Sequence, residues 1–259
     1  MKERGLSMSF DGRVAIVTGA GSKRGIGQAT ALALARKGAD LVIGDVDLSG
    51  AERISKAVRE LGRRALAIQV DISRAEDVAT LINRAIQEFG RIDILVNNAG
   101  ITQPITVLKM TEEDWDRIVR VNMKGTFLCS KAVLPTMIKQ GYGRIVNLSS
   151  VSAKRGGGVY GGAHYSAAKA GILGFAKALA REVAGYGITV NSVAPGLIAT
   201  DIRGGLEDPE RQQEISKDIP CKRLGKPEEV AAAIAFLASE EAGYITGEEI
   251  DINGGSHMD

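Results

Sequence analysis

The chain has 259 residues, of which 25% are charged, and its formal net charge is only +2. Acidic and basic residues are interspersed, so no block of one sign indicates a nucleic acid or a membrane as the partner, and a small molecule is expected instead. The first ten residues contain no apolar leader and no long apolar run follows them, which predicts a soluble, cytoplasmic protein.

Length and cysteine content narrow the architecture further. A chain of this length commonly forms one α/β domain, so we expect a single domain over residues 1–259, with residues 1–10 as a flexible tail. The two cysteines, Cys129 and Cys221, lie far apart in unrelated contexts. They predict neither a disulfide framework nor a metal site.

The first regular segment has the pattern strand, glycine turn, helix. Residues 13–18 are a β-branched run that stops at Gly19, and an alanine- and leucine-rich segment follows Gly27 as far as Lys37. Glycines between the two allow a sharp turn that approaches a pyrophosphate closely, with free N–H groups of the helix facing the phosphates. A second strand, residues 41–45, ends in the carboxylate of Asp45, which can accept hydrogen bonds from adenosine ribose hydroxyls. Together these features favour a dinucleotide-binding site.

Strands and helices then alternate as helix 49–61, strand 64–70, helix 74–89 and strand 92–96. Such alternation implies right-handed crossovers and a parallel sheet. The strands are nearly continuous apolar runs, which is typical of strands buried on both faces. The expected fold class is therefore α/β, with a single doubly wound parallel sheet (a Rossmann fold) and helices on both faces.

Polar residues follow the fourth strand and recur in the next helix. Asn97 and Asn98 come directly after strand 92–96, and since ligands bind beyond the carboxyl ends of such strands, both are expected at the cofactor crevice unless they form a plain turn. A helix is expected over 111–139. Asn122 within it is either a satisfied core amide or a site residue.

The fifth strand, residues 144–148, delivers Ser150 to the same edge of the sheet. The helix expected over 163–184 carries Tyr165 and Lys169 at i, i+4 spacing, which places both side chains on one face. A phenol titrates at about 10, and a nearby ammonium ion can lower its pKa toward neutrality. An isolated pair of this kind is most often a surface pair, so the other motifs decide its meaning.

The remaining elements complete the sheet. A sixth strand is expected over 187–193, a last helix over 228–238 and a last strand over 247–252. Residues 201–222 are charged and lack a clear core stripe. We expect this segment to form a lid-like substrate loop.

Taken together, the motifs resemble the short-chain dehydrogenase/reductase family from about Arg13 to Gly255. The stretches 145–171 and 189–200 are most similar to the 3-oxoacyl-[acyl-carrier-protein] reductases, although sugar, polyol and steroid dehydrogenases share them. The resemblance rests on an ordered set of motifs, namely Thr18–Gly27, Asp71, Asn97–Gly100, Asn122, Ser150, Tyr165 with Lys169, Pro195–Gly196 with Thr200, and Asn253–Gly255.

Two features depart from the family pattern. Five residues separate Gly19 from Gly25, more than the family usually has, and the interval from Ser150 to Tyr165 is also longer than usual. The first leaves the contacts of Gly21 open and the second can reshape the substrate entrance. Surface loops absorb such insertions at little cost, so neither is expected to abolish the site.

The resemblance implies roles for individual residues. Tyr165 would exchange a proton with the substrate oxygen, Ser150 would hydrogen-bond to that oxygen, and Lys169 would lower the pKa of Tyr165 and hold the nicotinamide ribose. Asn122 would hold a water molecule of the proton relay. The implied cofactor-binding residues are Gly19, Gly21, Arg24, Gly25, Ile26, Gly27, Asp45, Asp71, Ile72, Asn98, Ala99, Gly100, Tyr165, Lys169, Pro195, Gly196, Ile198 and Thr200.

The expected reaction is hydride transfer between a nicotinamide coenzyme and a ketone or secondary alcohol, with an acyl thioester as the substrate that the resemblance favours. A sugar or polyol dehydrogenase is the alternative, and a non-catalytic dinucleotide-binding sensor is a more remote one. A serine hydrolase is disfavoured, because only His164 and His257 could serve as its base and no nucleophile elbow is present. His164 itself is expected to be structural or part of the substrate pocket, which residues 103–107 and 151–160 should shape.

Signals for the coenzyme conflict. Asp45 can bind the ribose hydroxyls of NAD and would repel a 2′-phosphate, whereas Arg24, helped by Lys23, resembles the basic residue that NADP-dependent relatives keep in the glycine turn. Because Asp45 is fixed at a strand end while the longer turn lets Arg24 swing toward solvent, NAD is predicted, with NADP as the alternative.

A homotetramer is expected from the resemblance and from helix 163–184, which has more than one apolar face. Helix 111–139 is its expected partner surface. The last strand should lie near a second interface.

Overall fold

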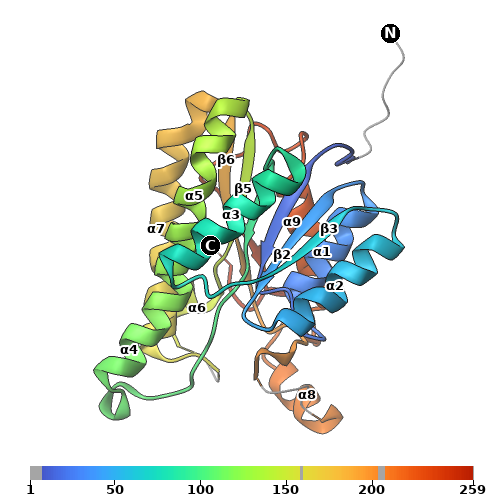
Figure 1. Cartoon of the computed structure of the whole chain (residues 1–259). Helices are drawn as coiled ribbons and strands as arrows, with labels where there is room; N and C mark the ends of the chain where they lie inside the picture. Colours follow the sequence, from blue (N-terminus) through green and yellow to red (C-terminus); the bar gives the residue numbers. More distant parts are fainter. Residues whose placement is uncertain (1–7, 158–159, 204–207, 259) are drawn as a thin grey trace.

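The computed structural model describes residues 8–157, 160–203 and 208–258. Within these ranges, seven parallel strands form one sheet in the order β3-β2-β1-β4-β5-β6-β7 (Figure 1). This confirms the predicted doubly wound parallel sheet. The strands are β1 (Val14–Thr18), β2 (Asp40–Asp45), β3 (Ala65–Gln69), β4 (Ile94–Asn97), β5 (Gly143–Leu148), β6 (Ile188–Pro195) and β7 (Glu249–Ile252).

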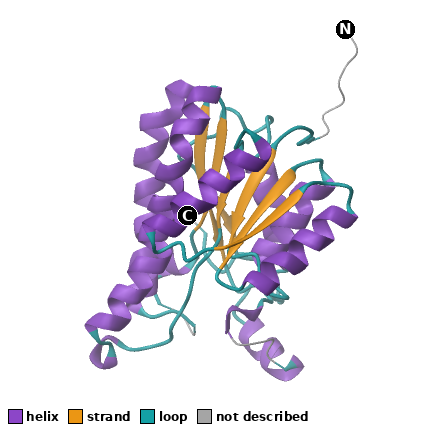
Figure 2. Cartoon of the chain, in the orientation of Figure 1, coloured by secondary structure: helices purple, strands orange, loops and turns teal. Residues whose placement is uncertain are grey.

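Helices flank the sheet on both faces, as Figure 2 shows. Most of them connect successive strands, because neighbouring parallel strands need a crossover connection. The helices are α1 (Ile26–Arg36), α2 (Leu48–Glu60), α3 (Ala75–Phe89), α4 (Glu112–Val119), α5 (Gly125–Gln140), α6 (Ser152–Arg155), α7 (Ala163–Val183), α8 (Pro209–Ser216) and α9 (Pro227–Leu237), with short turns η1 (Val107–Lys109), η2 (Arg120–Lys124), η3 (Ala184–Tyr186) and η4 (Asp201–Arg203).

The alternation of side chains along each strand builds two cores. Ala15 and Val17 of β1 pack with α1, α2 and α9, whereas Val14 and Ile16 pack with α3, α5 and α7. All four side chains are almost completely buried. Successive residues of a strand point to opposite faces, so a strand covered on both sides must be apolar throughout.

The structure differs from the sequence prediction in the long helix over 111–139. That segment is interrupted by η2, a π-helical turn between α4 and α5. A π-helical turn is a single turn with i→i+5 hydrogen bonds inside an otherwise α-helical segment, and such turns are frequent at functional sites. Asn122 lies in this turn.

Residues 201–222 are more regular than predicted. They contain η4 and the eight-residue helix α8, in which Asp208 caps the first turn by accepting a hydrogen bond from the Arg211 N–H at 2.8 Å. The rest of the expected lid, residues 204–207, lies outside the described residues.

The prediction of a flexible tail over residues 1–10 is wrong for Phe10. Residues 1–7 lie outside the described residues, but Phe10 is 1% exposed and packs in the core that contains α1. Its N–H donates to the Lys37 carbonyl at 2.7 Å. Phe10 is therefore part of the folded domain.

None of the helices in the described ranges combines the length and apolarity that crossing a bilayer requires.

Candidate active site

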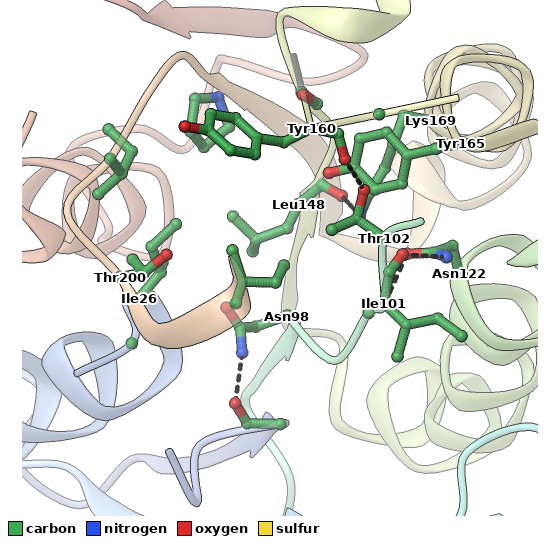
Figure 3. Close-up of a pocket in the computed structure, with 18 of the residues that line it drawn as sticks. Ile26, Asn98, Ile101, Thr102, Asn122, Leu148, Tyr160, Tyr165, Lys169 and Thr200 are labelled. Carbon is green, nitrogen blue, oxygen red and sulfur yellow. Dashed lines mark hydrogen bonds between the residues drawn. The ribbon is translucent and has the colours of Figure 1, made fainter. Parts of the chain in front are cut away.

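A cavity of about 1010 Å³ lies at the carboxyl ends of the strands. The residues to which the family resemblance gave catalytic or cofactor-binding roles all line it, whereas Asn97, also expected at the crevice, does not. Figure 3 shows Tyr165 and Lys169 on one side of the cavity, with Ile26 and Thr200 on the other. The fold thus brings together residues spread from Gly19 to Thr200, as the carboxyl-edge rule for α/β sheets predicts.

The glycine turn is fixed in place by the end of β4. Gly19 has φ +69°, and a Cβ atom there would lie 2.5 Å from the Cα of Ala99. Asn98 donates from Nδ2 to the carbonyls of Thr18 at 2.9 Å and Gly19 at 2.8 Å. Only glycine allows both the positive φ and this approach of the two backbones.

Asp45 lies directly against the turn. Its Oδ2 accepts a hydrogen bond from the Gly21 N–H at 2.6 Å, and its Oδ1 accepts one from Asp47 at 2.9 Å. A Cβ atom on Gly21 would lie only 2.8 Å from the Asp45 Cγ. The carboxylate is therefore held at the cavity wall, where it could meet a ribose.

The start of α1 suits the pyrophosphate of a dinucleotide. Its N-cap is Gly25, which places no side chain over the N–H groups of the first turn, and these groups carry the positive end of the helix dipole. The glycine turn, Asp45 and the size of the cavity together fit a dinucleotide coenzyme.

Arg24 was predicted to swing toward solvent, but its side chain is bound to another residue of the cavity wall. Its Nε donates to Oδ1 of Asp201 at 2.9 Å. The two residues are 177 positions apart in the sequence, so no local pattern predicts the contact.

Lys169 is buried at the opposite side of the cavity. Its side chain is only 4% exposed and its Nζ donates to the Leu148 carbonyl at 2.6 Å (Figure 3). Burial lowers the pKa of Lys169 to about 8. The ammonium form still predominates at neutral pH and places a positive charge inside the site.

Two effects act in opposite directions on the pKa of Tyr165. Burial raises the pKa of the phenol above its ordinary value, and a hydrogen bond with Ser150 acts in the opposite direction. The Nζ atom of Lys169 donates to the Leu148 carbonyl and lies 5.7 Å from the centroid of the tyrosine ring, and its lowering of the Tyr165 pKa stays a prediction. In this state the phenol is a protonated acid.

The two serines after β5 have different environments. The Oγ of Ser150 accepts a hydrogen bond from the Ser152 N–H at 3.1 Å and is linked to Tyr165. The Oγ of Ser149 instead donates to the Lys169 carbonyl at 3.1 Å. Ser149 thus joins β5 to α7, and Ser150 is the one paired with the phenol.

Asn122 connects the π-helical turn to the cavity wall. Its Nδ2 donates to the carbonyls of Ile101 at 2.9 Å and Ile118 at 3.0 Å, and its Oδ1 accepts from the Ile101 N–H at 3.3 Å. The side chain is fully buried. It therefore fixes the backbone of Ile101, which lines the cavity.

Other polar residues near these motifs do not reach the cavity. Asn97, expected beside Asn98, points into the core and donates to Ser130 at 3.0 Å and Asn147 at 2.8 Å. His164 is 0% exposed, and its Nδ1 accepts the Tyr165 N–H at 2.9 Å. The alternation of side chains along β4 and the helical geometry of α7 turn both away from the cavity.

The lining also includes residues that the sequence analysis did not single out. Ile101 and Thr102 line the cavity in place of residues 103–107, and Thr102 donates from Oγ1 to the Tyr160 carbonyl at 2.5 Å. Asp201 and Arg211 belong to the predicted lid segment and line it too. In the sequence, only their position after the Pro195 motif indicated that they could line the cavity.

Comparisons with known proteins agree with this geometry. A family model described as enoyl-(acyl carrier protein) reductase matches residues 19–257. The 3-oxoacyl-[acyl-carrier-protein] reductase FabG of Escherichia coli (strain K12) is 44% identical over 251 residues, covering 97% of this chain and 100% of the relative. The 3-oxoacyl-[acyl-carrier-protein] reductase of Synechocystis sp. is 46% identical over 248 residues, covering 95% and 97%.

The fold has a close counterpart among solved structures. A crystal structure from Sinorhizobium meliloti 1021, described as a short-chain alcohol dehydrogenase, superposes with a TM-score of 0.90 at 37% sequence identity, covering 96% of this chain and 98% of that one. Both sequence and fold therefore agree with the motifs at the cavity. The chain belongs to the short-chain dehydrogenase/reductase family of oxidoreductases.

Proposed function

We propose that the protein interconverts a ketone and a secondary alcohol with a nicotinamide coenzyme, and that the ketone is a 3-oxoacyl thioester. The observation that carries the proposal is the convergence of Tyr165, Lys169 and Ser150 on the cavity that the glycine turn also lines. The similarity to 3-oxoacyl-[acyl-carrier-protein] reductases over nearly the whole chain supports the acyl substrate.

The chain's own residues supply the proton chemistry. Tyr165 carries a phenol proton, which it would donate to the carbonyl oxygen, while the Ser150 hydroxyl would hydrogen-bond to the same oxygen. As the proton leaves, the phenolate that develops is stabilised by the buried charge of Lys169. The coenzyme, when bound, supplies the hydride.

Aliphatic residues in the lining favour an acyl chain over a sugar or polyol. An acyl chain would pack against these side chains, whereas each polyol hydroxyl that faced them without a partner would cost about 1–3 kcal/mol. These residues come from the segments after β5 and β6 and from α8 and the residues that follow it, namely Val151, Leu197, Ile202, Ile215 and Ile219.

The coenzyme would be held by the turn and α1 at its pyrophosphate, by Asp45 at the adenosine ribose and by Lys169 at the nicotinamide ribose. Similarity to the 3-oxoacyl reductases weighs toward NADP, through Arg24. Asp45 weighs toward NAD, because a carboxylate about 4 Å from a phosphate costs roughly 4 kcal/mol per unit charge at an effective dielectric constant of about 20. NAD remains the prediction, and NADP the alternative.

Kinetics with both reduced coenzymes decide between them. The prediction is a higher kcat/KM with NADH than with NADPH on the same ketone, and a shift toward NADPH in Asp45→Ser. A wild-type preference for NADPH would instead show that the basic residues of the turn control the choice.

A substrate panel tests the reaction. Purified protein is assayed with reduced coenzyme and, separately, a 3-oxoacyl thioester, the corresponding enoyl thioester, a cyclic ketone and a keto sugar. The proposal expects the highest kcat/KM with the 3-oxoacyl thioester. Preference for the enoyl thioester would favour the activity in the family model's description, and coenzyme binding without turnover on any carbonyl would favour a sensor.

We also propose a homotetramer, assembled through α5 and α7. Phe127 of α5 is 42% exposed and meets Phe175 of α7 edge to face, with ring centroids 6.2 Å apart. Met123, next to Asn122, is 37% exposed on the same side and packs against Gly171. Sedimentation velocity at micromolar concentration should give a tetramer, and a monomer would refute the proposal.

A further inference from the structure

Arg24 and Asp201 are joined by three hydrogen bonds. Arg24 donates to the carboxylate from its backbone N–H, to Oδ2 at 2.9 Å, and from Nε, to Oδ1 at 2.9 Å. The Asp201 N–H donates to the Arg24 carbonyl, also at 2.9 Å. The arginine is therefore held at both its backbone and its side chain, and the two bonds to the carboxylate are charge-assisted.

The carboxylates of Asp201 and Asp45 bind different parts of the glycine turn. Asp45 accepts from the Gly21 N–H at 2.6 Å, and Asp201 binds Arg24, three residues further on. Asp45, Arg24 and Asp201 all line the cavity. Their formal charges sum to −1, so the charge of Arg24 is balanced by its neighbours. Arg53, which donates to the Gly21 carbonyl at 2.5 Å, lies near a carboxylate of its own, Asp47.

The pair is also accessible enough to exchange partners. The Arg24 side chain is 54% exposed and the Asp201 side chain is 24% exposed. Ion pairs with this exposure contribute little net stability, because water screens them. A phosphate could therefore bind Arg24 in place of Asp201, but it would first have to break the bonds between Arg24 and the Asp201 carboxylate.

We propose that Asp201 is a specificity-determining residue for the coenzyme, which disfavours NADP by competing with its 2′-phosphate for Arg24. This inference rests on the proposed nicotinamide-dependent function. The effect of Asp201 is separate from that of Asp45, which would repel the 2′-phosphate directly. Removing the carboxylate frees the guanidinium and removes the negative charge that is bonded to it.

The test is isothermal titration calorimetry with NADH and NADPH on the full-length protein and on Asp201→Asn. We expect the variant to bind NADPH about fivefold more tightly, the effect of one partly exposed charge pair, with NADH affinity changed less than twofold. The matched control is Glu214→Gln, which removes a carboxylate from the same cavity lining. Glu214 is paired with Lys217 at 2.6 Å, and its substitution should leave the NADPH-to-NADH ratio unchanged.

Two further variants separate the mechanism from general electrostatics. In Arg24→Ala/Asp201→Asn the gain in NADPH affinity should vanish, because the guanidinium that produces it is gone. Arg24→Ala alone should change NADPH affinity less than twofold, a result that does not depend on whether Asp201→Asn folds. Three results would each overturn the proposal. The first is an unchanged ratio of NADPH to NADH affinity in Asp201→Asn, and the second is an equal gain in NADPH affinity in Glu214→Gln. The third is a large loss of NADPH affinity in Arg24→Ala. Wild-type protein that binds neither nucleotide would instead refute the proposed function itself.

Discussion

The Nζ atom of Lys169 lies 5.7 Å from the centroid of the Tyr165 ring. It is held there by the Leu148 carbonyl, at 2.6 Å, rather than by the phenol. The lysine therefore places a buried charge beside the acid without drawing its proton away. Tyr165 remains protonated, and burial disfavours the charged form of Lys169.

The buried ammonium of Lys169 predicts that the difference in stability between wild type and a variant without this lysine changes with pH. Burial lowers the pKa of Lys169 from 10.5 to about 8, so between these values the folded chain binds fewer protons than the unfolded chain, and its stability rises with pH. Relative to Lys169→Met, the wild-type free energy of unfolding should increase by about 3 kcal/mol between pH 7 and 10.5. Urea unfolding at several pH values measures this.

The control for that measurement is Lys177→Met, which removes an exposed lysine from the same helix. Its difference from wild type should stay nearly constant over the same range. A constant difference for Lys169→Met as well would contradict the account of a buried ammonium.

The glycine turn predicts a contrast between two glycines with positive φ. Gly12 has φ +73° and open space where a Cβ would lie, whereas at Gly19, with φ +69°, a Cβ would lie 2.5 Å from the Ala99 backbone. Gly12→Ala should cost about 1 kcal/mol in unfolding free energy through backbone strain alone. Gly19→Ala should cost about 1–3 kcal/mol more through overpacking. Equal costs in denaturant titrations would show that the contact with Ala99 is unimportant.

Asn122 and Asn97 are a second informative pair. Both are buried amides with two hydrogen bonds from Nδ2, so substitution by alanine should destabilise either protein by about 1–3 kcal/mol. Only Asn122 holds Ile101 at the cavity wall. Turnover measured well below the unfolding transition should therefore fall in Asn122→Ala and stay near wild type in Asn97→Ala. A comparable fall in both variants would indicate a general effect of stability.

Much of the fold and site could be predicted from the sequence because local patterns specify them. Continuous apolar strands that end at or shortly before Gly19, Asp45, Asn98 and Ser150 place those residues at one edge of a parallel sheet. The i, i+4 spacing of Tyr165 and Lys169 likewise requires only a helix. These inferences depend on periodicity and on chain direction, which sequence contains.

What could not be predicted depends on contacts between distant segments. The Arg24 bond to Asp201 joins residues 177 positions apart, and the Lys169 bond to Leu148 depends on a backbone carbonyl that has no residue-specific signal. Helix α8 has no continuous apolar stripe, so the sequence pattern did not predict a helix there. Phe10 looked like part of a tail because one aromatic residue forms no pattern, yet it is buried.

The most direct test of the account is the Tyr165→Phe variant, compared with Tyr186→Phe, which makes the same change at an exposed tyrosine of η3. Reduction of a 3-oxoacyl thioester is followed by coenzyme oxidation, and coenzyme affinity by calorimetry. Because only the proton donor is lost, kcat/KM should fall by about 10³-fold or more in Tyr165→Phe, with coenzyme affinity within twofold of wild type and Tyr186→Phe unaffected. Residual activity of Tyr165→Phe within tenfold of wild type would contradict the assignment of Tyr165 as the acid.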